Sequence, residues 1–128
     1  MTPVLFSVSY AGYWGQHQLG LIPFLEKAAS LGYPAVELTA KRPHLSVLDH
    51  PDAESVHVVK DSADRLGIEI ATVAGYTDFT SGRQAAEVPF VEMQILYVRQ
   101  LARFAQAPGS QKSSELHRLL HRSGQPPQ

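Results

Sequence analysis

Short apolar runs alternate along the chain with longer segments in which apolar residues recur every three or four positions. The first run, Val4 to Tyr10, is rich in β-branched and aromatic residues and lies between Pro3 and Gly12, which is typical of a strand. From Leu21 the spacing becomes that of one helical face, and Gly32 supplies a left-handed stop. These segments predict a strand followed by a helix.

The same order follows twice more. The run AVELT at 35–39 predicts a second strand, and Pro51, Asp52 and Glu54 place proline and acidic groups in the first turn of a helix that Gly67 ends. The apolar stripe of that helix comprises Val56, Val59, Ala63 and Leu66. The run IEIATVA at 68–74 predicts a third strand.

A long third helix is expected to begin near Pro89 and to cover a sheet. Its apolar residues are Phe90, Ile95, Tyr97, Val98, Leu101 and Phe104. Three strand-helix units of roughly 30 residues each predict an α/β fold with parallel strands and right-handed crossovers.

The strand-to-helix connections are long. AGYWGQHQLG, AKRPHLSVLDH and GYTDFTSGRQAAEV exceed the about 2 to 6 residues that are usual there, whereas the helix-to-strand turns are minimal. In parallel α/β folds such loops gather at the carboxyl ends of the strands, where ligands bind. One end of the sheet is therefore expected to bind a ligand.

Composition narrows the class of protein. A hydrophobic share of 44% and a charged share of 18% are those of a globular domain, and a net charge of -1 without a basic run argues against nucleic acid and anionic membranes as partners. The absence of cysteine excludes disulfides and thiolate metal sites. Without a signal-peptide pattern or a run of about 18 to 20 apolar residues, a soluble cytoplasmic protein is expected.

Three segments resemble the amino-terminal half of the sugar phosphate isomerase/epimerase family, whose members are xylose-isomerase-like (β/α)₈ TIM barrels. These segments are VSYAGYWGQ, LIPFLEKAASLGYPAVEL and LGIEIATVAGYTDF. The resemblance covers about residues 4 to 107, under half of a barrel of roughly 250 residues. It implies a partial TIM barrel over residues 1–107.

The resemblance also implies an activity in carbohydrate metabolism. Members of the family isomerise aldoses and ketoses or epimerise beside a carbonyl, usually on a divalent metal held by carboxylates and a histidine. Those ligands belong to later strands, so no catalytic or metal-binding residue is carried over to this chain. The chain alone is expected to be a truncated barrel that binds no metal and is inactive.

Residues 108–128 form a polar tail that departs from the family pattern. It contains no Val, Ile, Phe, Tyr or Trp and therefore cannot supply the buried fourth strand that the order of elements requires. A short helix around SSELHRLLHR or disorder is expected. A shifted reading frame or an artificial terminus would explain such a tail.

Two polar residues are candidates for binding a sugar or sugar phosphate. Glu37 alternates with Val36 and Leu38, so it faces away from them and would face a barrel interior, as a ligand to a hydroxyl or as a structural carboxylate. His44 lies with Lys41 and Arg42 in the second long loop, where cationic donors would hold a phosphate or polyol or simply be solvated.

Aromatic residues complete the candidate set. Tyr10, Trp14 and Tyr76 lie at or beyond strand ends, where rings line a carbohydrate pocket or pack as core or lid. Asp78 is interpreted as a cap for local backbone rather than a ligand. The loop histidines His17, His44 and His50 are weak metal candidates because they are scattered without a fixed spacing. His117 and His121 are four residues apart, but Arg118 stands where the zinc-protease pattern has a glutamate.

Three functions remain in view. The first is the isomerase or epimerase that the resemblance implies, and the second is a non-catalytic half-barrel that associates with another chain through open sheet edges. A related DNA-repair endonuclease branch is disfavoured by the charge balance.

Overall fold

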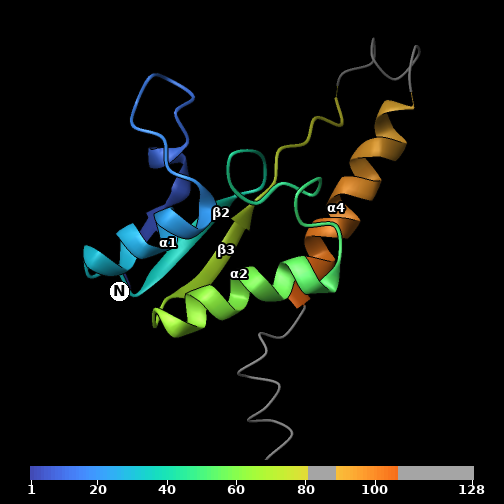
Figure 1. Ribbon diagram of the computed structural model, residues 1–128. Helices are drawn as coiled ribbons and strands as arrows, with labels where there is room; N and C mark the ends of the chain where they lie inside the picture. The colour runs from blue at the N-terminus through green and yellow to red at the C-terminus, as the bar shows by residue number, and fades with distance from the viewer. Residues whose placement is uncertain (81–88, 107–128) are drawn as a thin grey trace, which may run out of the picture.

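The computed structural model of the chain describes residues 1–80 and 89–106 and shows a mixed α/β fold (Figure 1). A parallel sheet has the order β1-β2-β3, with β1 at Val4–Phe6, β2 at Ala35–Thr39 and β3 at Glu69–Ala74. The helices are α1, Leu21–Ser30, α2, Ala53–Arg65, and α4, Phe90–Gln106. The predicted α/β class with parallel strands is confirmed. The predicted tail at 108–128 lies outside the described residues.

Strand β2 is the centre of the sheet. Val4 of β1 pairs with Ala35, and on the other side Ala35 pairs with Glu69 of β3. The register shifts once, between Val36 and Glu37. Within the described residues, β1 and β3 each pair on one side only, so the sheet has two open edges.

The hydrophobic core lies on the side of the sheet that α1 and α2 cover (Figure 1). Val36 and Leu38 are fully buried there, between the apolar faces of the two helices. The helical residues of this core are Leu21, Phe24, Leu25, Ala28, Val56, Val59 and Ala63. Because strand side chains alternate between faces, Glu37 and Thr39 lie on the opposite side.

The ends of α1 and α2 follow from local chemistry. Asp52 caps α2 by accepting a hydrogen bond from the Ser55 backbone N–H at 2.9 Å, and the Ser55 hydroxyl reciprocates in a capping box. Gly32 and Gly67 follow the two helices with φ of 83° and 69°, a conformation that glycine adopts without strain. The predicted helix stops are therefore confirmed.

The predicted first strand is too long. The strand ends at Phe6, and Ser7–Tyr10 form a 3-10 helix, η1. The Ser7 side chain is buried and its Oγ accepts a hydrogen bond from the Thr39 N–H at 2.8 Å, so a side chain replaces the backbone ladder at this level. The pattern of apolar residues does not predict that a side-chain hydrogen bond takes the place of a backbone one here.

The predicted third helix is present as α4, but only part of its apolar residues is covered. Phe104 is buried, but Ile95 and Val98 are each 43% exposed. The helix instead packs by another side, where a Cβ added to Gly75 would lie 3.0 Å from Leu101 Cδ1. Leu66, predicted in the stripe of α2, is also exposed because it lies at the helix end.

Within residues 1–80 and 89–106, no helix is both long and apolar enough to cross a bilayer.

Replacing Leu25 tests the core. Its side chain is fully buried between α1 and the sheet, so Leu25→Ala is expected to lower the free energy of unfolding by about 2–5 kcal/mol through lost burial and a cavity. Leu31→Ala, at a position 52% exposed, should change it by only about 0.5 kcal/mol. Urea denaturation measures both, and equal losses would contradict this core.

Candidate functional site

Aromatic and polar side chains from four segments meet at the carboxyl ends of β2 and β3. We call Tyr13, Thr39, Lys41, Tyr76 and Tyr97 the tyrosine cluster. The Thr39 hydroxyl donates a hydrogen bond to the Tyr76 hydroxyl at 2.7 Å. The Tyr97 hydroxyl donates to the Ala40 carbonyl at 2.5 Å and accepts from the Tyr76 N–H at 3.4 Å. These hydrogen bonds join α4 and the loop after β3 to the carboxyl end of β2.

The Lys41 ammonium is held by aromatic rings. Its Nζ lies 4.3 Å from the ring centroid of Tyr13 and 4.3 Å from that of Tyr76. The neighbouring Arg42 is paired with Asp49 at 2.7 Å, whereas Lys41 has no carboxylate partner within residues 1–80 and 89–106. Ring faces orient a cation without neutralising it. Lys41 is therefore the cation of this loop that can meet an anionic or polyhydroxylated ligand.

The phenols of the cluster are hydrogen-bonding groups rather than bases. Burial raises the pKa of Tyr13, and the neighbouring Tyr76 and Tyr97 raise it further, against the opposing effect of a hydrogen bond with Thr39. Burial also raises the pKa of Tyr97. Both hydroxyls are protonated near neutral pH, and the Tyr13 hydroxyl donates to the Arg42 carbonyl at 2.6 Å. They can donate to and accept from ligand hydroxyls.

Glu37 lies on the same face of β2 as Thr39. The two residues are two positions apart, roughly 7 Å along the strand, and the register places Glu37 between Phe6 of β1 and Thr72 of β3. Its side chain is half-buried on the face opposite the core. The orientation predicted from alternation is thus what the structure has. A role in binding a ligand stays a prediction.

The structure brings some of the predicted residues together. Tyr76 belongs to the tyrosine cluster, and Trp14, 78% exposed, meets the edge of Tyr13 with ring centroids 5.9 Å apart. Tyr10 instead packs against Phe24 of the core, at 6.0 Å between ring centroids. Trp14 and Tyr76 thus lie beside the carboxyl end of β2, Glu37 lies in the middle of that strand, and Tyr10 turns toward the helices.

His44 is placed differently from the sequence expectation of a loop residue open to a ligand. It is 1% exposed, its Nε2 lies 2.9 Å from the Leu19 carbonyl, and its ring packs 5.5 Å from that of Phe24. The loop turns back to the strand end, where the Leu45 N–H donates to the Thr39 carbonyl at 3.1 Å. In this arrangement His44 reaches no ligand in solvent. A contact would require the loop to move.

Sequence reasoning missed Tyr13, Thr39 and Tyr97 as site residues. Thr39 closes a predicted strand at its carboxyl end, and that position was a usable signal. Tyr97 belongs to the apolar residues expected in the third helix, although its hydroxyl serves the cluster. Tyr13 is adjacent to Trp14, and nothing local distinguishes which ring faces Lys41.

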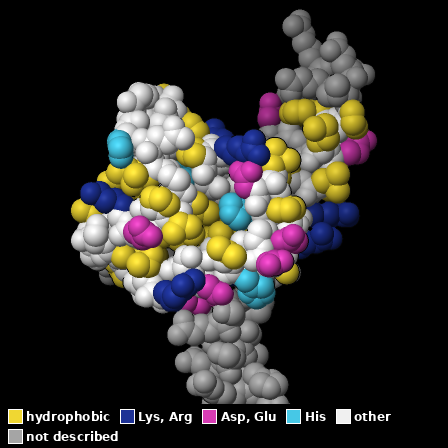
Figure 2. Space-filling view, in the orientation of Figure 1, with side chains coloured by type: hydrophobic (Ala, Val, Ile, Leu, Met, Phe, Trp, Pro, Cys, Tyr) yellow, Lys and Arg dark blue, Asp and Glu magenta, His cyan; other side chains and the backbone are white. Residues whose placement is uncertain are grey.

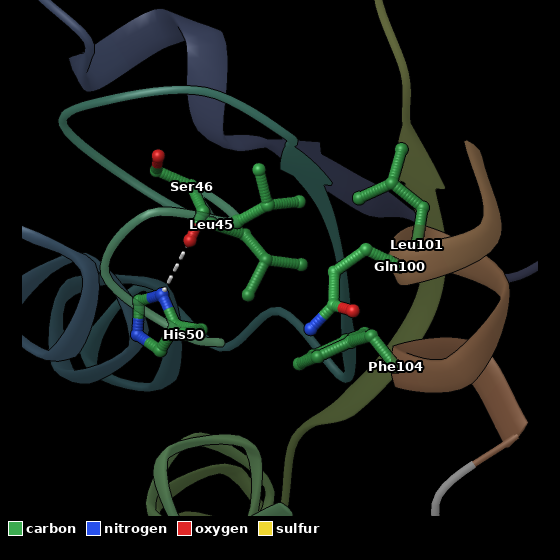
Figure 3. Close-up of a pocket in the computed structure, with 7 residues that line it drawn as sticks. Leu45, Ser46, His50, Gln100, Leu101 and Phe104 are labelled. Carbon is green, nitrogen blue, oxygen red and sulfur yellow. Dashed lines mark hydrogen bonds between the residues drawn. The ribbon is translucent and has the colours of Figure 1, made fainter. Parts of the chain in front are cut away.

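A concavity lies between α4 and the loop after β2, away from the tyrosine cluster. Its lining includes Leu45, Ser46, His50, Gln100, Leu101 and Phe104 (Figure 3). The His50 Nδ1 lies 3.2 Å from the Ser46 carbonyl, so this polar group is already engaged. The cavity volume is about 10 Å³, room for roughly one water molecule, whereas ligand pockets usually measure about 300 to 1,000 Å³. This recess is a packing seam.

The donors for a metal do not come together in this part of the chain. Among the described residues, no three His, Asp or Glu side chains are grouped as a cation site. Asp78 serves its own loop, because its Oδ1 accepts from the Thr80 N–H at 2.8 Å and from the Thr80 hydroxyl at 2.7 Å. The predicted cap is confirmed. His117 and His121 lie outside the described residues.

Comparison of the chain with protein-family models, with curated proteins and with solved structures found no significant match.

The burial of His44 predicts a pH dependence of stability. Burial lowers the pKa of His44 below its ordinary 6.5, so the folded state binds fewer protons than the unfolded state in the window below that value. Stability should be full above pH 6.5 and fall as pH is lowered through that window.

Urea denaturation between neutral pH and mild acid measures this slope. His44→Phe, which keeps a ring in the core, should flatten it even if overall stability changes. His17→Asn, a substitution at an exposed histidine, is the matched control. An unchanged slope in His44→Phe would contradict the placement of this ring.

Proposed function

We propose that the chain is the amino-terminal part of a xylose-isomerase-like TIM barrel of the sugar phosphate isomerase/epimerase kind, and that the tyrosine cluster is part of its substrate-binding wall. The observation that carries the proposal is the position of that cluster. Aromatic rings, hydroxyls and an ammonium without a carboxylate partner among the described residues gather at the carboxyl ends of parallel strands, where barrel enzymes bind their ligands.

The chemistry of the cluster suits a sugar or sugar phosphate. A sugar ring offers an apolar C–H face to an aromatic ring and hydroxyls to polar groups at its edge. Trp14 and Tyr76 are exposed rings, and Lys41 carries a positive charge between the rings of Tyr13 and Tyr76. Lys41 would meet a phosphate or hydroxyl, and Glu37 would accept from a hydroxyl deeper along the strand.

The reacting groups of the proposed enzyme would come from elsewhere. Isomerisation beside a carbonyl needs a Lewis acid on adjacent oxygens and a base near the C–H proton. The described residues do not form a metal site, so they do not fit that part of the machinery. The divalent metal is proposed only for a complete barrel. For this chain we propose binding without turnover.

A second candidate is a non-catalytic half-barrel that associates with another chain. The observation that favours it is the pair of open sheet edges at β1 and β3, because unpaired backbone groups on an edge recruit further strands. The sheet face of Glu37 and Thr72 also lacks a covering helix among the described residues. This candidate needs no substrate.

The single tryptophan offers a direct test of ligand binding. Trp14 is exposed beside Tyr13, so a sugar that stacks at the cluster should change its fluorescence. Titration with simple ketoses and their phosphates is expected to saturate. Tyr76→Ala should weaken binding about tenfold or more, whereas Tyr33→Ala, at the opposite end of β2, should leave it unchanged.

Lys41→Gln separates the two ligand classes. Loss of the ammonium should weaken a sugar phosphate more than the parent sugar, because the charge attracts the phosphate. No saturable change with any of these ligands, or equal losses in Tyr76→Ala and Tyr33→Ala, would refute the proposed site. Turnover of a ketose by this chain with an added divalent metal would refute the binding-only proposal.

A further inference from the structure

Helix α4 carries a second apolar face that nothing in residues 1–80 and 89–106 covers. Its residues are Val91, Ile95, Val98, Ala102 and Ala105, which we call the α4 stripe. They recur at alternating spacings of four and three, the seam of a coiled coil. Val91 is 38% exposed, and Ile95 and Val98 are each 43% exposed. Figure 2 shows hydrophobic side chains at the surface of the arm that α4 forms.

The α4 stripe is separate from the side by which α4 packs on the rest of the protein. That side uses the Tyr97 hydroxyl on the Ala40 carbonyl and Leu101 against Gly75. Phe104 beside the Lys60 ammonium, 5.0 Å from its ring centroid, belongs to the same side. Since these contacts anchor α4 without the stripe, residues 1–80 and 89–106 leave the stripe accessible to a partner.

We propose that the α4 stripe pairs with the α4 stripe of a second copy of this chain, in antiparallel orientation. Side-chain volumes fit such a pair. With Ile95 level with Val98 of the second copy, Val91 lies opposite Ala102, so a large residue meets a small one in each flanking layer. Two central layers of Ile and Val then fill the seam, as knobs of one helix in holes of the other.

Charge decides the orientation. Glu92 and Arg99 are seven residues apart along one border of the stripe, and neither is ion-paired within the described residues. In the antiparallel register Glu92 approaches Arg99 of the second copy, and Arg99 approaches Glu92, so two ion pairs form. A parallel pair would bring Arg99 beside Gln94 of the second copy, with neither ion pair.

The pairing makes the second candidate function specific. The helix pairing rests on the half-barrel candidate, because both assign a second chain as the partner. It differs in placing the contact on α4 rather than on the sheet edges. It does not depend on sugar binding, because Tyr97, the α4 residue of the tyrosine cluster, lies about 200° around the helix from Ile95 at the centre of the stripe. A helix of 17 residues is only roughly 25 Å long. The dimer should therefore be weak and concentration-dependent.

Sedimentation equilibrium of the full chain, over about 1 to 500 µM, tests the proposal. The chain is expected to shift from monomer to dimer within this range. Ile95→Lys places a charge in the centre of the seam and should keep the chain monomeric. Met93→Lys is the matched control, because Met93 is 59% exposed but lies about 200° around the helix from Ile95. It should dimerise as the unaltered chain does.

A charge exchange tests the orientation. Glu92→Arg and Arg99→Glu are each expected to weaken the dimer at least about threefold, since each leaves like charges opposed. The double variant should recover the original affinity. Arg103→Glu makes the same change of charge outside the predicted ion pairs and should have a smaller effect. Circular dichroism confirms that each variant keeps its helices.

Three results would overturn the pairing. One is a chain that stays monomeric throughout the concentration range, and another is an equal loss of the dimer in Ile95→Lys and Met93→Lys. The third is a dimer that persists in Ile95→Lys, which would mean that the copies meet at the sheet edges. In that last case the half-barrel candidate stands and only the helix pairing fails. The change of Trp14 fluorescence on titration with sugars tests the substrate-binding proposal independently of these results.

Discussion

Strand β2 is paired on both sides, and the alternation of its side chains between two faces organises everything around it. Val36 and Leu38 are buried beneath α1 and α2, while Glu37 and Thr39 are directed to the other face. A slip of one residue in this register would exchange the two sets, placing a carboxylate in the core and two aliphatic side chains on the open face. The cost of that exchange fixes the register.

The candidate site is a consequence of that register. Because Thr39 ends β2 on the face away from the core, its hydroxyl lies where the loops after all three strands converge. The loop after β2 then divides its residues between two environments. Lys41 goes outward between the rings of Tyr13 and Tyr76, and His44 goes inward against Phe24. A solvent-facing cation and a buried imidazole are thus only three positions apart in the chain.

Helix α4 has more apolar surface than the described part of the fold can cover. One side docks through Tyr97 and Leu101 at the end of the sheet, and the α4 stripe is left facing outward. Apolar surface exposed in a contiguous stripe is costly in water, and its burial against another surface lowers the free energy. The same geometry that holds the site together thus leaves a face available for association.

The sequence by itself determined the order of strands and helices, the parallel crossovers and the helix stops at Gly32 and Gly67. These depend on apolar spacing and on backbone conformations that are set within a few residues. It also determined that Glu37 faces away from Val36 and Leu38, since alternation is a local property of a strand.

Only the tertiary structure decided which side chains meet. Ser7 ended the first strand early because its hydroxyl found Thr39, which is 32 residues away in the chain. His44 became part of the core, and Ile95 did not, because burial depends on which distant segments arrive to cover a residue. The spacing of apolar residues within one segment does not predict which other segments will pack against it.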